Sequence, residues 1–191
     1  MSWPKVALGE VCDFNPKTPR ELGDDLPVSF LPMASMGEDG RVAKLETRSL
    51  GEVRKGYTFF RRDDVLAAKI TPCYENNKIG IAHISTECGF ASTEFHVISP
   101  DETKLDRRYL TYFIRRDGLR RLGEKRMTGS AGQKRVPINF YKELEIPLPP
   151  LEEQKRIAAI LDKADELRRL RRRAIDRLDT LAQSIFYDMF G

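Results

Sequence analysis

The chain has 191 residues, of which 40% are hydrophobic and 32% are charged, and its formal net charge is +4. This composition is typical of a globular protein with one sizeable core plus an appendage, and no apolar run approaches the ~20 residues that a membrane-spanning helix needs. Three widely spaced cysteines and two histidines supply neither a disulfide framework nor a zinc site. We therefore expect a cytoplasmic protein with buried thiols, no metal site and no membrane contact.

Residues 1–99 begin with a short amphipathic stretch and a proline-rich link, and then change in character. From Val28 to Ser99, short apolar or alternating runs such as VSFLPM, DVLAAKI and TEFHVIS are separated by turn signals, among them Asp39-Gly40 and Asn76-Asn77. Short runs of this kind, bounded by glycine and asparagine, are typical of strands joined by tight turns. The pattern predicts a compact antiparallel β unit.

One turn of this unit, Lys69–Lys78 (KITPCYENNK), gathers polar side chains around a proline. The side chains that could contact a ligand are Lys69, Thr71, Tyr74, Asn76, Asn77 and Lys78. A binding loop and a plain hairpin turn explain this stretch about equally well.

The most basic part of the chain is the segment 104–135, which contains eleven Lys or Arg residues and three acids. A local excess of this size is typical of a surface that binds a polyanion, whereas a solvated helix face usually carries both signs of charge. Within the segment, Arg107–Arg116 has apolar residues on one side and arginines on the other, which predicts a helix. Asp117-Gly118 is expected to end that helix.

The stretch from Arg120 to Pro137 (RRLGEKRMTGSAGQKRVP) predicts a glycine-rich loop. Its three glycines make the backbone permissive, so that it can approach a phosphate or a base edge closely. Glutamine and arginine side chains are suited to two-point contacts with adenine and guanine. The spacing of a nucleotide-binding P-loop is absent. The donors of this loop are Ser130, Gln133, Lys134 and Arg135.

The common catalytic patterns of nucleic-acid enzymes are not found in the sequence. Pro100–Lys104 (PDETK) holds the letters of a metal-dependent nuclease motif, but they are adjacent, and a surface turn is the better interpretation. Asn15-Pro16 is followed by Lys17 and Thr18, which leaves no aromatic side chain to stack on a flipped base. No glycine-rich strand–turn–helix predicts a dinucleotide or S-adenosylmethionine site. We therefore expect a chain that binds and positions its partners, that catalyses no reaction itself and that needs no cofactor.

The C-terminal stretch from Glu152 to Met189 contains no proline or glycine and predicts one long helix. Such a helix is about 57 Å long at ~1.5 Å per residue. The prolines of Ile146–Pro150 favour a sharp start. A helix that covers the core of its own domain is the alternative, although a compact domain of this size needs no such rod. We expect a domain over residues 1–148 and a helical region over residues 149–191.

Apolar residues of this helix recur with a heptad spacing and form a stripe that we call the seam. Arg171 and Asp188 interrupt it. The spacing favours a stripe that is shared with another helix. The seam consists of Ile157, Ala164, Leu178 and Ile185 at one heptad position and of Ile160, Leu167, Ala174 and Leu181 at the other.

These residues resemble a known family. The segment Ile146–Asp165 (IPLPPLEEQKRIAAILDKAD), followed by a helix that ends in Ala182–Phe190 (AQSIFYDMF), strongly resembles the conserved helical region of specificity subunits of type I restriction-modification systems. The helical signature is the more specific part. Weaker similarities to the family occur upstream in the same order, at Trp3–Phe14, Asp64–Ala82, Gly89–Ile98 and Thr128–Pro137.

The resemblance implies a non-catalytic subunit that reads double-stranded DNA for a modification methyltransferase and, where present, a translocating restriction endonuclease. It implies an α+β protein, with a compact β-rich target recognition domain followed by one long C-terminal helix that pairs antiparallel with a second copy. Family members typically carry two such domains and two helices, whereas this chain has one of each. A half-sized subunit that forms a homodimer and a truncated product both fit, and the seam favours the homodimer.

A two-fold homodimer predicts a palindromic, bipartite target. The helix of about 57 Å exceeds one DNA turn of ~34–36 Å, so the half-sites can lie on one face of the duplex. Two other classes of function are a coiled-coil assembly adaptor without DNA readout and, less compatible with the missing motifs, a stand-alone nuclease or methyltransferase.

Carried over by motif position, the resemblance implies two groups of DNA contacts. The expected contacts from the two loops are Lys69, Thr71, Asn76, Asn77, Lys78, Ser130, Gln133, Lys134 and Arg135. The expected phosphate contacts are Arg115, Arg116, Arg120, Arg121 and Arg126.

Overall fold

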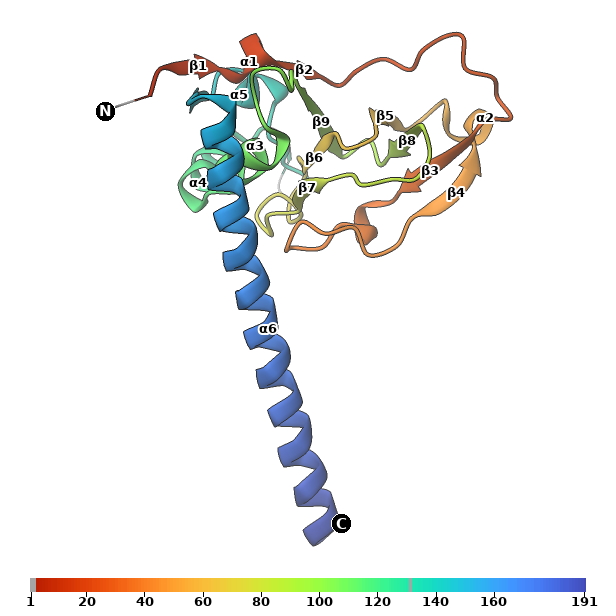
Figure 1. Ribbon diagram of the computed structural model, residues 1–191. Helices are drawn as coiled ribbons and strands as arrows, with labels where there is room; N and C mark the ends of the chain where they lie inside the picture. The colour runs from red at the N-terminus through yellow and green to blue at the C-terminus, as the bar shows by residue number, and fades with distance from the viewer. Residues whose placement is uncertain (1–2, 131) are drawn as a thin grey trace.

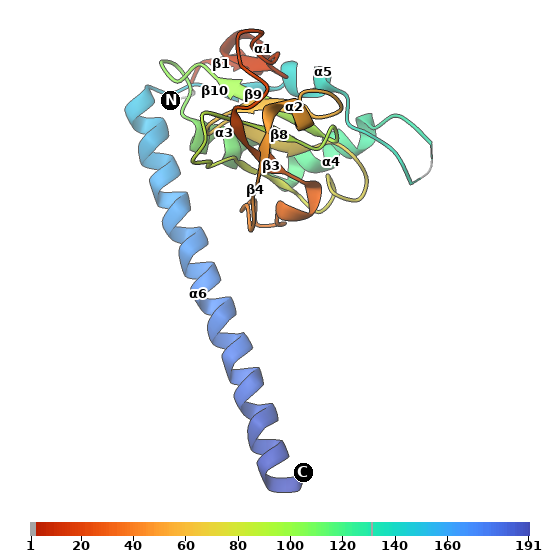
Figure 2. The ribbon, with the colours of Figure 1, turned by 90° about the vertical axis from the view of Figure 1, so that its right-hand side faces the viewer.

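The structure, a computed structural model, describes residues 3–130 and 132–191 and has an α+β architecture. A β-rich domain is followed by one long helix that projects from it (Figures 1 and 2). The expected fold class, a β-rich domain with a long C-terminal helix, is confirmed. Within the described residues, no helix is both long and apolar enough to cross a membrane.

Two four-stranded sheets form the centre of the domain. The first sheet is antiparallel and has the order β2 (Cys12–Phe14), β9 (Phe95–Pro100), β6 (Val65–Ala68), β7 (Ile79–Ile81). The second sheet has the order β4 (Glu46–Ser49), β3 (Pro27–Leu31), β8 (Cys88–Ala91), β5 (Thr58–Arg61).

The second sheet corrects one expectation, because its β3–β8 pair is parallel, with Phe30 opposite Phe90. The prediction of an antiparallel unit is wrong at this pair. Alternation of apolar and polar residues reports which face of a strand is buried and carries no information about strand direction. The chain between β3 and β8 contains four further strands, which is enough for the crossover that a parallel pair requires.

The core lies on both faces of these sheets. One buried cluster joins Leu31 and Phe60 of the second sheet to Leu66 and Val97 of the first. A second cluster covers the far side of the second sheet, where Phe90 packs near α2 (Leu50–Val53). The third and largest cluster lies between the first sheet and the helices. Removing apolar surface from water contributes about 25 cal/mol of stabilising free energy per Å², and this burial is what stabilises the domain.

Three helices pack against the first sheet: α3 (Arg107–Ile114), α4 (Asp117–Arg126) and α5 (Ile138–Lys142). Helix α3 confirms the predicted helix, and the carboxylate of Asp106 caps it by accepting hydrogen bonds from the backbone N–H groups of Arg108 and Tyr109 at 3.0 Å. The expectation that Asp117-Gly118 ends this helix is wrong. These residues form the first turn of α4, where an acidic side chain suits the positive end of the helix dipole.

Helix α4 also corrects the expected loop over residues 120–137, of which only the part after Arg126 is a loop. Gly123 lies in the helix because Tyr74 packs there. A Cβ atom on Gly123 would come within 1.9 Å of the Tyr74 hydroxyl oxygen. The glycine therefore serves packing at this position, and the sequence pattern alone did not distinguish this use from loop flexibility.

The two ends of the domain meet at the start of the long helix. Strand β1 (Lys5–Ala7) pairs antiparallel with β10 (Glu145–Pro147), and a short helix, α1 (Leu8–Val11), follows it. The Leu148 N–H donates to the Pro4 carbonyl oxygen at 2.8 Å. The remaining short element, a 3-10 turn, is Met33–Ser35.

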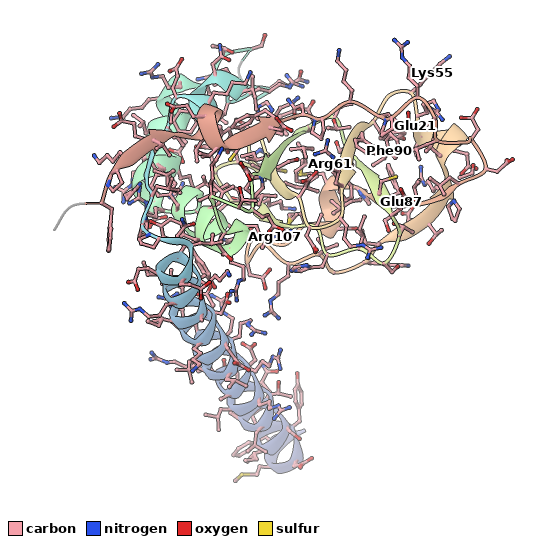
Figure 3. All side chains as sticks on the ribbon, turned by 45° about the horizontal axis from the view of Figure 1, so that its top comes forward. Glu21, Lys55, Arg61, Glu87, Phe90 and Arg107 are labelled. Atoms are coloured by element: carbon pink, nitrogen blue, oxygen red, sulfur yellow. The ribbon has the colours of Figure 1, made fainter. Side chains whose placement is uncertain are left out.

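The long helix α6 (Leu151–Phe190) is continuous over 40 residues, which confirms the predicted helix. Pro150 precedes it, as expected for a sharp start. The buried Gln154 ties its first turn to the domain. The Gln154 amide donates to the carbonyl oxygens of Lys104 and Pro149 at 2.9 Å, and its own oxygen accepts from the Asp106 N–H at 2.9 Å. The domain covers only the first turns of α6, and from Leu170 onward every residue is exposed (Figure 3).

Candidate nucleic-acid interface

The two loops that the sequence singled out lie side by side. The Thr71 N–H donates to the Lys134 carbonyl oxygen at 3.0 Å, and the Val136 N–H donates to the Lys69 carbonyl oxygen at 2.9 Å. An antiparallel bridge joins Ile70 to Arg135 between these bonds. We call residues 69–78 the first loop, residues 128–136 the late loop, and both together the paired loops. Ala131 of the late loop lies outside the described residues.

The late loop is a hairpin closed by its own backbone. Thr128 and Arg135 exchange two N–H to carbonyl hydrogen bonds at 3.0 and 2.8 Å, and the Gln133 N–H donates to the Ser130 carbonyl oxygen at 3.0 Å. Gly129 has φ +120° and Gly132 has φ +78°, a region that residues with a Cβ atom rarely adopt. The hairpin presents Ser130, Gln133 and Lys134, all of which are exposed.

Arg135 behaves differently from its neighbours in this hairpin. Its guanidinium donates to both carboxylate oxygens of Glu94, at 2.9 and 2.7 Å, and to the Gln133 carbonyl oxygen at 3.0 Å. These hydrogen bonds from Arg135 lower the pKa of the Glu94 carboxyl group. Sequence reasoning missed Glu94 as a site residue, since a lone glutamate before a strand gives no signal of its partner.

A buried histidine lies beneath the paired loops. The His96 Nε2 donates to the Val136 carbonyl oxygen at 2.8 Å, next to the hydrogen bond between Val136 and Lys69. Burial lowers the pKa of His96 from 6.5 to about 4. Burial also lowers the pKa of Lys69, whose side chain is half-buried at the edge of the loops.

Most polar side chains of the first loop hold the loop itself in place. The Thr71 hydroxyl donates to the Glu75 carboxylate at 2.8 Å. Asn77 has φ +56°, and its amide donates to the Arg115 carbonyl oxygen at 3.2 Å. The Lys78 ammonium donates to the Met33 carbonyl oxygen at 3.5 Å. Asn76 alone of the loop's predicted contacts is exposed.

The arginines of the basic segment divide into two groups. The Arg115 guanidinium donates to the carbonyl oxygens of Ile79 and Glu38, and Arg120 pairs with Glu124 at 2.6 Å. The second group lies on the surface, with Arg116 stacked over the Phe113 ring at 4.2 Å from its centroid. The exposed basic residues of the segment after α3 are Arg116, Arg121, Lys125, Arg126 and Lys134.

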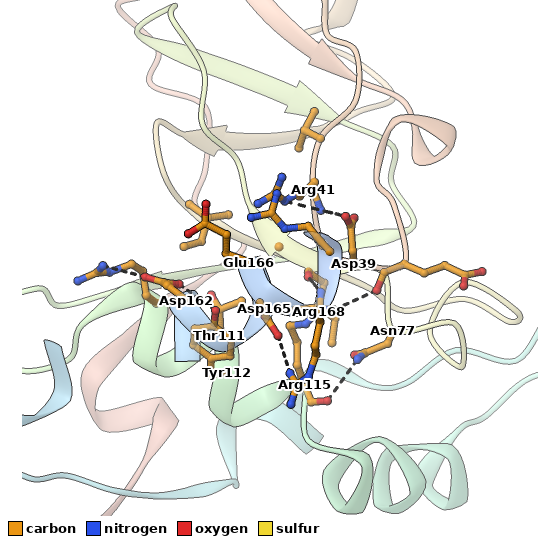
Figure 4. A pocket seen from close by; sticks show the side chains of 18 of the residues that line it. Asp39, Arg41, Asn77, Thr111, Tyr112, Arg115, Asp162, Asp165, Glu166 and Arg168 are labelled. Carbon is orange, nitrogen blue, oxygen red and sulfur yellow. Dashed lines mark hydrogen bonds and ion pairs between the residues drawn. The ribbon is translucent and has the colours of Figure 1, made fainter. Parts of the chain in front are cut away.

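A groove of about 1330 Å³ lies in the corner between the domain and α6, where charged side chains of both signs meet. The Asp162 carboxylate accepts from the Tyr112 hydroxyl at 2.8 Å and from the Arg108 guanidinium at 3.0 Å, so it fixes α6 against α3 (Figure 4). Because the acids neutralise the arginines, this corner lacks the one-sided charge of the segment 104–135.

The described residues contain no group of three or more potential metal ligands. Pro100–Lys104 forms the predicted surface turn, in which the Asp101 carboxylate accepts from the Thr103 hydroxyl at 2.6 Å. The three cysteines are free thiols, with Cys12 and Cys88 buried as expected and Cys73 half-buried. Burial raises the pKa of Cys12 to about 12, which makes this thiol a poor nucleophile.

The seam of α6 lies away from the domain. Gln154 and Ala158, which are buried, and Asp162 mark the side of α6 that faces the domain. At 100° per residue, the seam is centred about 165° around the helix from that side. Leu167 is 66% exposed and Leu178 is 64% exposed. Of the other seam residues, Ile157 and Ala164 are half-buried, and Ile160, Ala174, Leu181 and Ile185 are exposed.

Comparison with known proteins gives consistent matches. The model of the type I restriction modification DNA specificity domain matches residues 2–179. The specificity subunit of the Escherichia coli type I restriction enzyme EcoEI is 40% identical over 164 residues, which cover 84% of this chain and 27% of that subunit. The corresponding EcoAI subunit of the same species is 35% identical over 191 residues, which cover 96% of this chain and 32% of that subunit.

Two solved structures have the same fold. The HsdS subunit from Thermoanaerobacter tengcongensis gives a TM-score of 0.67 at 26% identity, covering 100% of this chain and 50% of that chain. A chain of a type I R-M system gives a TM-score of 0.73 at 24% identity, again covering 100% of this chain and 50% of the other. This chain thus spans about a third of its curated relatives or less and half of the solved chains. With most of its length matched by the family model, the chain belongs to the family of type I restriction modification DNA specificity domains.

Proposed function

We propose that this chain is a non-catalytic specificity subunit that reads double-stranded DNA through its paired loops and positions a modification methyltransferase. In systems that contain one, a restriction endonuclease joins the same assembly. The observation that carries the proposal is that the chain, a member of this family, brings two distant loops together and exposes Gln133 and Lys134 on the late loop. The recognition domain corresponds to residues 1–148 and the spacer helix to residues 149–191.

The described contacts sort the candidate residues by role. Base contacts require donors that their own chain does not use, and Ser130, Gln133, Lys134 and Asn76 meet this condition by exposure. Lys69 lies at the edge of the same surface. Phosphate contacts fit the exposed Arg116, Arg121 and Arg126. The remaining candidates hold the loops or helices through contacts within the chain: Thr71, Asn77, Lys78, Arg115, Arg120 and Arg135.

The seam supports a homodimer as the working form. A helix whose apolar stripe lies in water gains stability when another helix covers the stripe. The domain of this chain packs on a different side of α6, so a partner helix can lie along the seam without meeting that domain. A second copy is the simplest partner, because it restores the two domains and two helices typical of the family.

An antiparallel pair with two-fold symmetry has one register that aligns the seams of both copies along their whole length, with Ile157 of each copy opposite Asp188 of the other. In it, Leu167 of each copy faces Leu178 of the other, Ile160 faces Ile185, and Ala164 faces Leu181. Arg171 then lies opposite the small Ala174, which leaves room for its side chain to reach solvent. Cysteines at Leu167 and Leu178 should cross-link the copies, whereas a pair at Leu167 and Ile185 should not. Cross-linking of the second pair alone would contradict this register.

This dimer implies the form of the DNA target. Helix α6 has 40 residues and is about 60 Å long at ~1.5 Å per residue, so antiparallel pairing holds the two domains apart at opposite ends. Two identical domains related by a two-fold axis read two identical half-sites in inverted order. The proposed target is therefore palindromic and bipartite, with half-sites roughly a helical turn apart or more.

The alternative is a coiled-coil adaptor without DNA readout. Removing the amide of Gln133 and the charge of Lys134 distinguishes it from a DNA-reading subunit. The double variant Gln133→Ala, Lys134→Ala should keep the dimer and the methyltransferase but lose preference for the target, because both changes lie on the exposed hairpin. Electrophoretic competition between target and random duplex measures this preference. Lys55→Ala, an exposed lysine beside α2 at the other end of the domain (Figure 3), is the matched control. Unchanged preference in the double variant would favour the adaptor.

A further inference from the structure

Glu94 lies where three segments of the candidate interface meet. Its carbonyl oxygen accepts a hydrogen bond from the Lys69 N–H at 2.9 Å, at the start of the first loop. Its carboxylate accepts two hydrogen bonds from Arg135, at 2.9 and 2.7 Å, at the end of the late loop. The residue itself directly precedes β9 of the first sheet. Glu94 thus ties both loops to the body of the domain.

Two hydrogen bonds join the Glu94 carboxylate to the Arg135 guanidinium, and we call this pair the clamp. Two parallel N–H to oxygen bonds fix both the distance and the plane of a guanidinium, which a single contact does not. The pair is partly shielded, with the Glu94 side chain 26% and the Arg135 side chain 40% exposed. Hydrogen bonds from Arg135 also lower the pKa of Glu94, so the carboxylate is charged at neutral pH.

The same contacts leave Arg135 poorly placed to bind DNA. A phosphate or guanine that took the guanidinium would leave the Glu94 carboxylate beside the DNA without its partner, and like charges in such a place are unfavourable. The third hydrogen bond of Arg135, to the Gln133 carbonyl oxygen at 3.0 Å, holds the backbone of the exposed hairpin instead.

We propose that Glu94 is a positioning residue for DNA readout and that Arg135 is its anchor in the late loop, not a DNA contact. The pair sets the late loop against the first loop and so fixes where Gln133 and Lys134 point. This inference rests on the proposed DNA-reading function. It assigns the basic side chain of the late loop that most resembles a guanine-binding residue to a structural task.

Glu94→Gln gives the most direct test, because it removes the carboxylate charge with little change in shape. A clamp predicts that the variant, in complex with the methyltransferase, binds the selected target at least threefold more weakly and discriminates less well against single-base changes. If Arg135 instead contacts DNA, loss of the opposing charge frees its guanidinium, and the target binds as tightly as to the wild type or more tightly. That outcome overturns the proposal.

The exchanged pair Glu94→Arg, Arg135→Glu provides a second test. Each single change places two like charges side by side, which costs several kcal/mol, and should therefore weaken target binding by about 30-fold or more. The exchanged pair should recover binding of the same target to within about threefold of the wild type. A double variant that melts like the wild type yet binds as weakly as Arg135→Glu would contradict the anchor role.

A measurement without DNA separates this inference from the proposed function. Amide hydrogen exchange at Thr71 and Val136, whose N–H groups join the paired loops, should be faster in Glu94→Gln than in the wild type. Unchanged exchange overturns the clamp whatever the DNA results are. If the wild-type complex selects no DNA sequence, the proposed function is overturned and the positioning role is overturned with it.

Discussion

The domain and the distal half of α6 both contain large apolar side chains, but the domain buries them and the helix leaves them exposed. Phe60 and Phe90 of the domain are fully buried, whereas Leu167 and Leu178 of the helix are more than half exposed. The domain finds its partners for burial within the chain, because strands and helices from distant segments cover one another. From Leu167 onward, the seam residues have no such cover among the described residues. The domain thus buries its apolar side chains within the chain, and the exposed seam is the part that the proposed second copy would cover.

Polar contacts differ between the two regions in the same way. The domain is held by pairs that are far apart in sequence, such as Glu94 with Arg135 and Arg115 with Glu38. The helix carries ion pairs three residues apart on its exposed surface, such as Asp165 with Arg168. Exposed pairs of that kind contribute about 0.2–0.5 kcal/mol each. The stability of the domain should therefore be independent of concentration, and helix pairing should depend on it.

The largest expected effect is on the domain core. Phe90→Ala removes a fully buried ring between the second sheet and α2, and should lower the free energy of unfolding by about 3–5 kcal/mol. Urea unfolding of the whole chain measures the loss. Phe190→Ala, which truncates an exposed ring near the end of α6, is the control and should change the value by less than about 0.5 kcal/mol. Equal losses in both variants would remove the contrast between the two regions.

The seam should show the reverse behaviour. Leu167→Ala alters two symmetry-related layers of the proposed dimer and should raise its dissociation constant by about 100-fold, while the domain keeps its stability. Sedimentation across a concentration series measures the constant. Phe186→Ala removes an exposed ring of α6 that lies outside the seam and should leave the constant nearly unchanged. An equal effect of the two changes would show that the seam is not the contact.

The buried His96 beneath the paired loops should make the stability of the domain depend on pH. Its pKa in the folded domain is about 4, below the ordinary 6.5, mainly because of burial, while Lys69 and Glu94 face the ring with opposite effects. The unfolded chain thus binds the proton more readily, and stability is lost as the pH falls from 6.5 toward 4. Between pH 7 and pH 5 this histidine should cost about 2 kcal/mol.

His96→Gln, which can keep the donor to Val136, should lose that part of the pH dependence. Urea unfolding at the two pH values measures the difference between variant and wild type. His83→Gln changes a histidine on the surface and serves as the control. A variant at position 96 with the wild-type pH dependence would contradict the assignment.

The smallest effect is expected on the exposed face of α4. Arg121→Ala should not change stability by more than about 0.5 kcal/mol, because the side chain is exposed. As a proposed phosphate contact, its removal should weaken all duplexes alike and reduce the salt dependence of log Kd against log salt by about one. A loss confined to the selected target would instead identify Arg121 as a base contact.

The sequence predicted α6 and the strands well because both follow from local periodicity. The heptad spacing of the seam and the prolines before Leu151 define the helix almost to the residue. The short strands follow from alternation and turn residues. The parallel β3–β8 pair was not predicted, because strand direction depends on how distant segments pack. The start of α4 at Asp117 was missed because an Asp-Gly pair serves a helix start and a helix end equally well.

The candidate site was predicted as two separate loops, and their contact was not. Nothing in KITPCYENNK indicates that the Lys69 carbonyl oxygen accepts a hydrogen bond from the Val136 N–H, because the two residues lie far apart in sequence. Charge counting likewise treated all arginines alike. The structure distinguishes Arg115, which donates to backbone carbonyl groups, from Arg121, which is exposed. Only the partners of each side chain make that distinction, and those partners lie far away in sequence.

The most direct test of the whole account is selection of duplexes from a random pool by the chain assembled with its methyltransferase. Two domains held apart by an antiparallel helix pair should enrich a motif with two specific half-sites in inverted repeat, separated by bases of no preference. The Leu167→Ala variant, tested near the weakened dissociation constant, should reduce that enrichment while the domain stays folded. A single contiguous motif would contradict the dimer, and no enriched motif at all would contradict DNA readout by the paired loops.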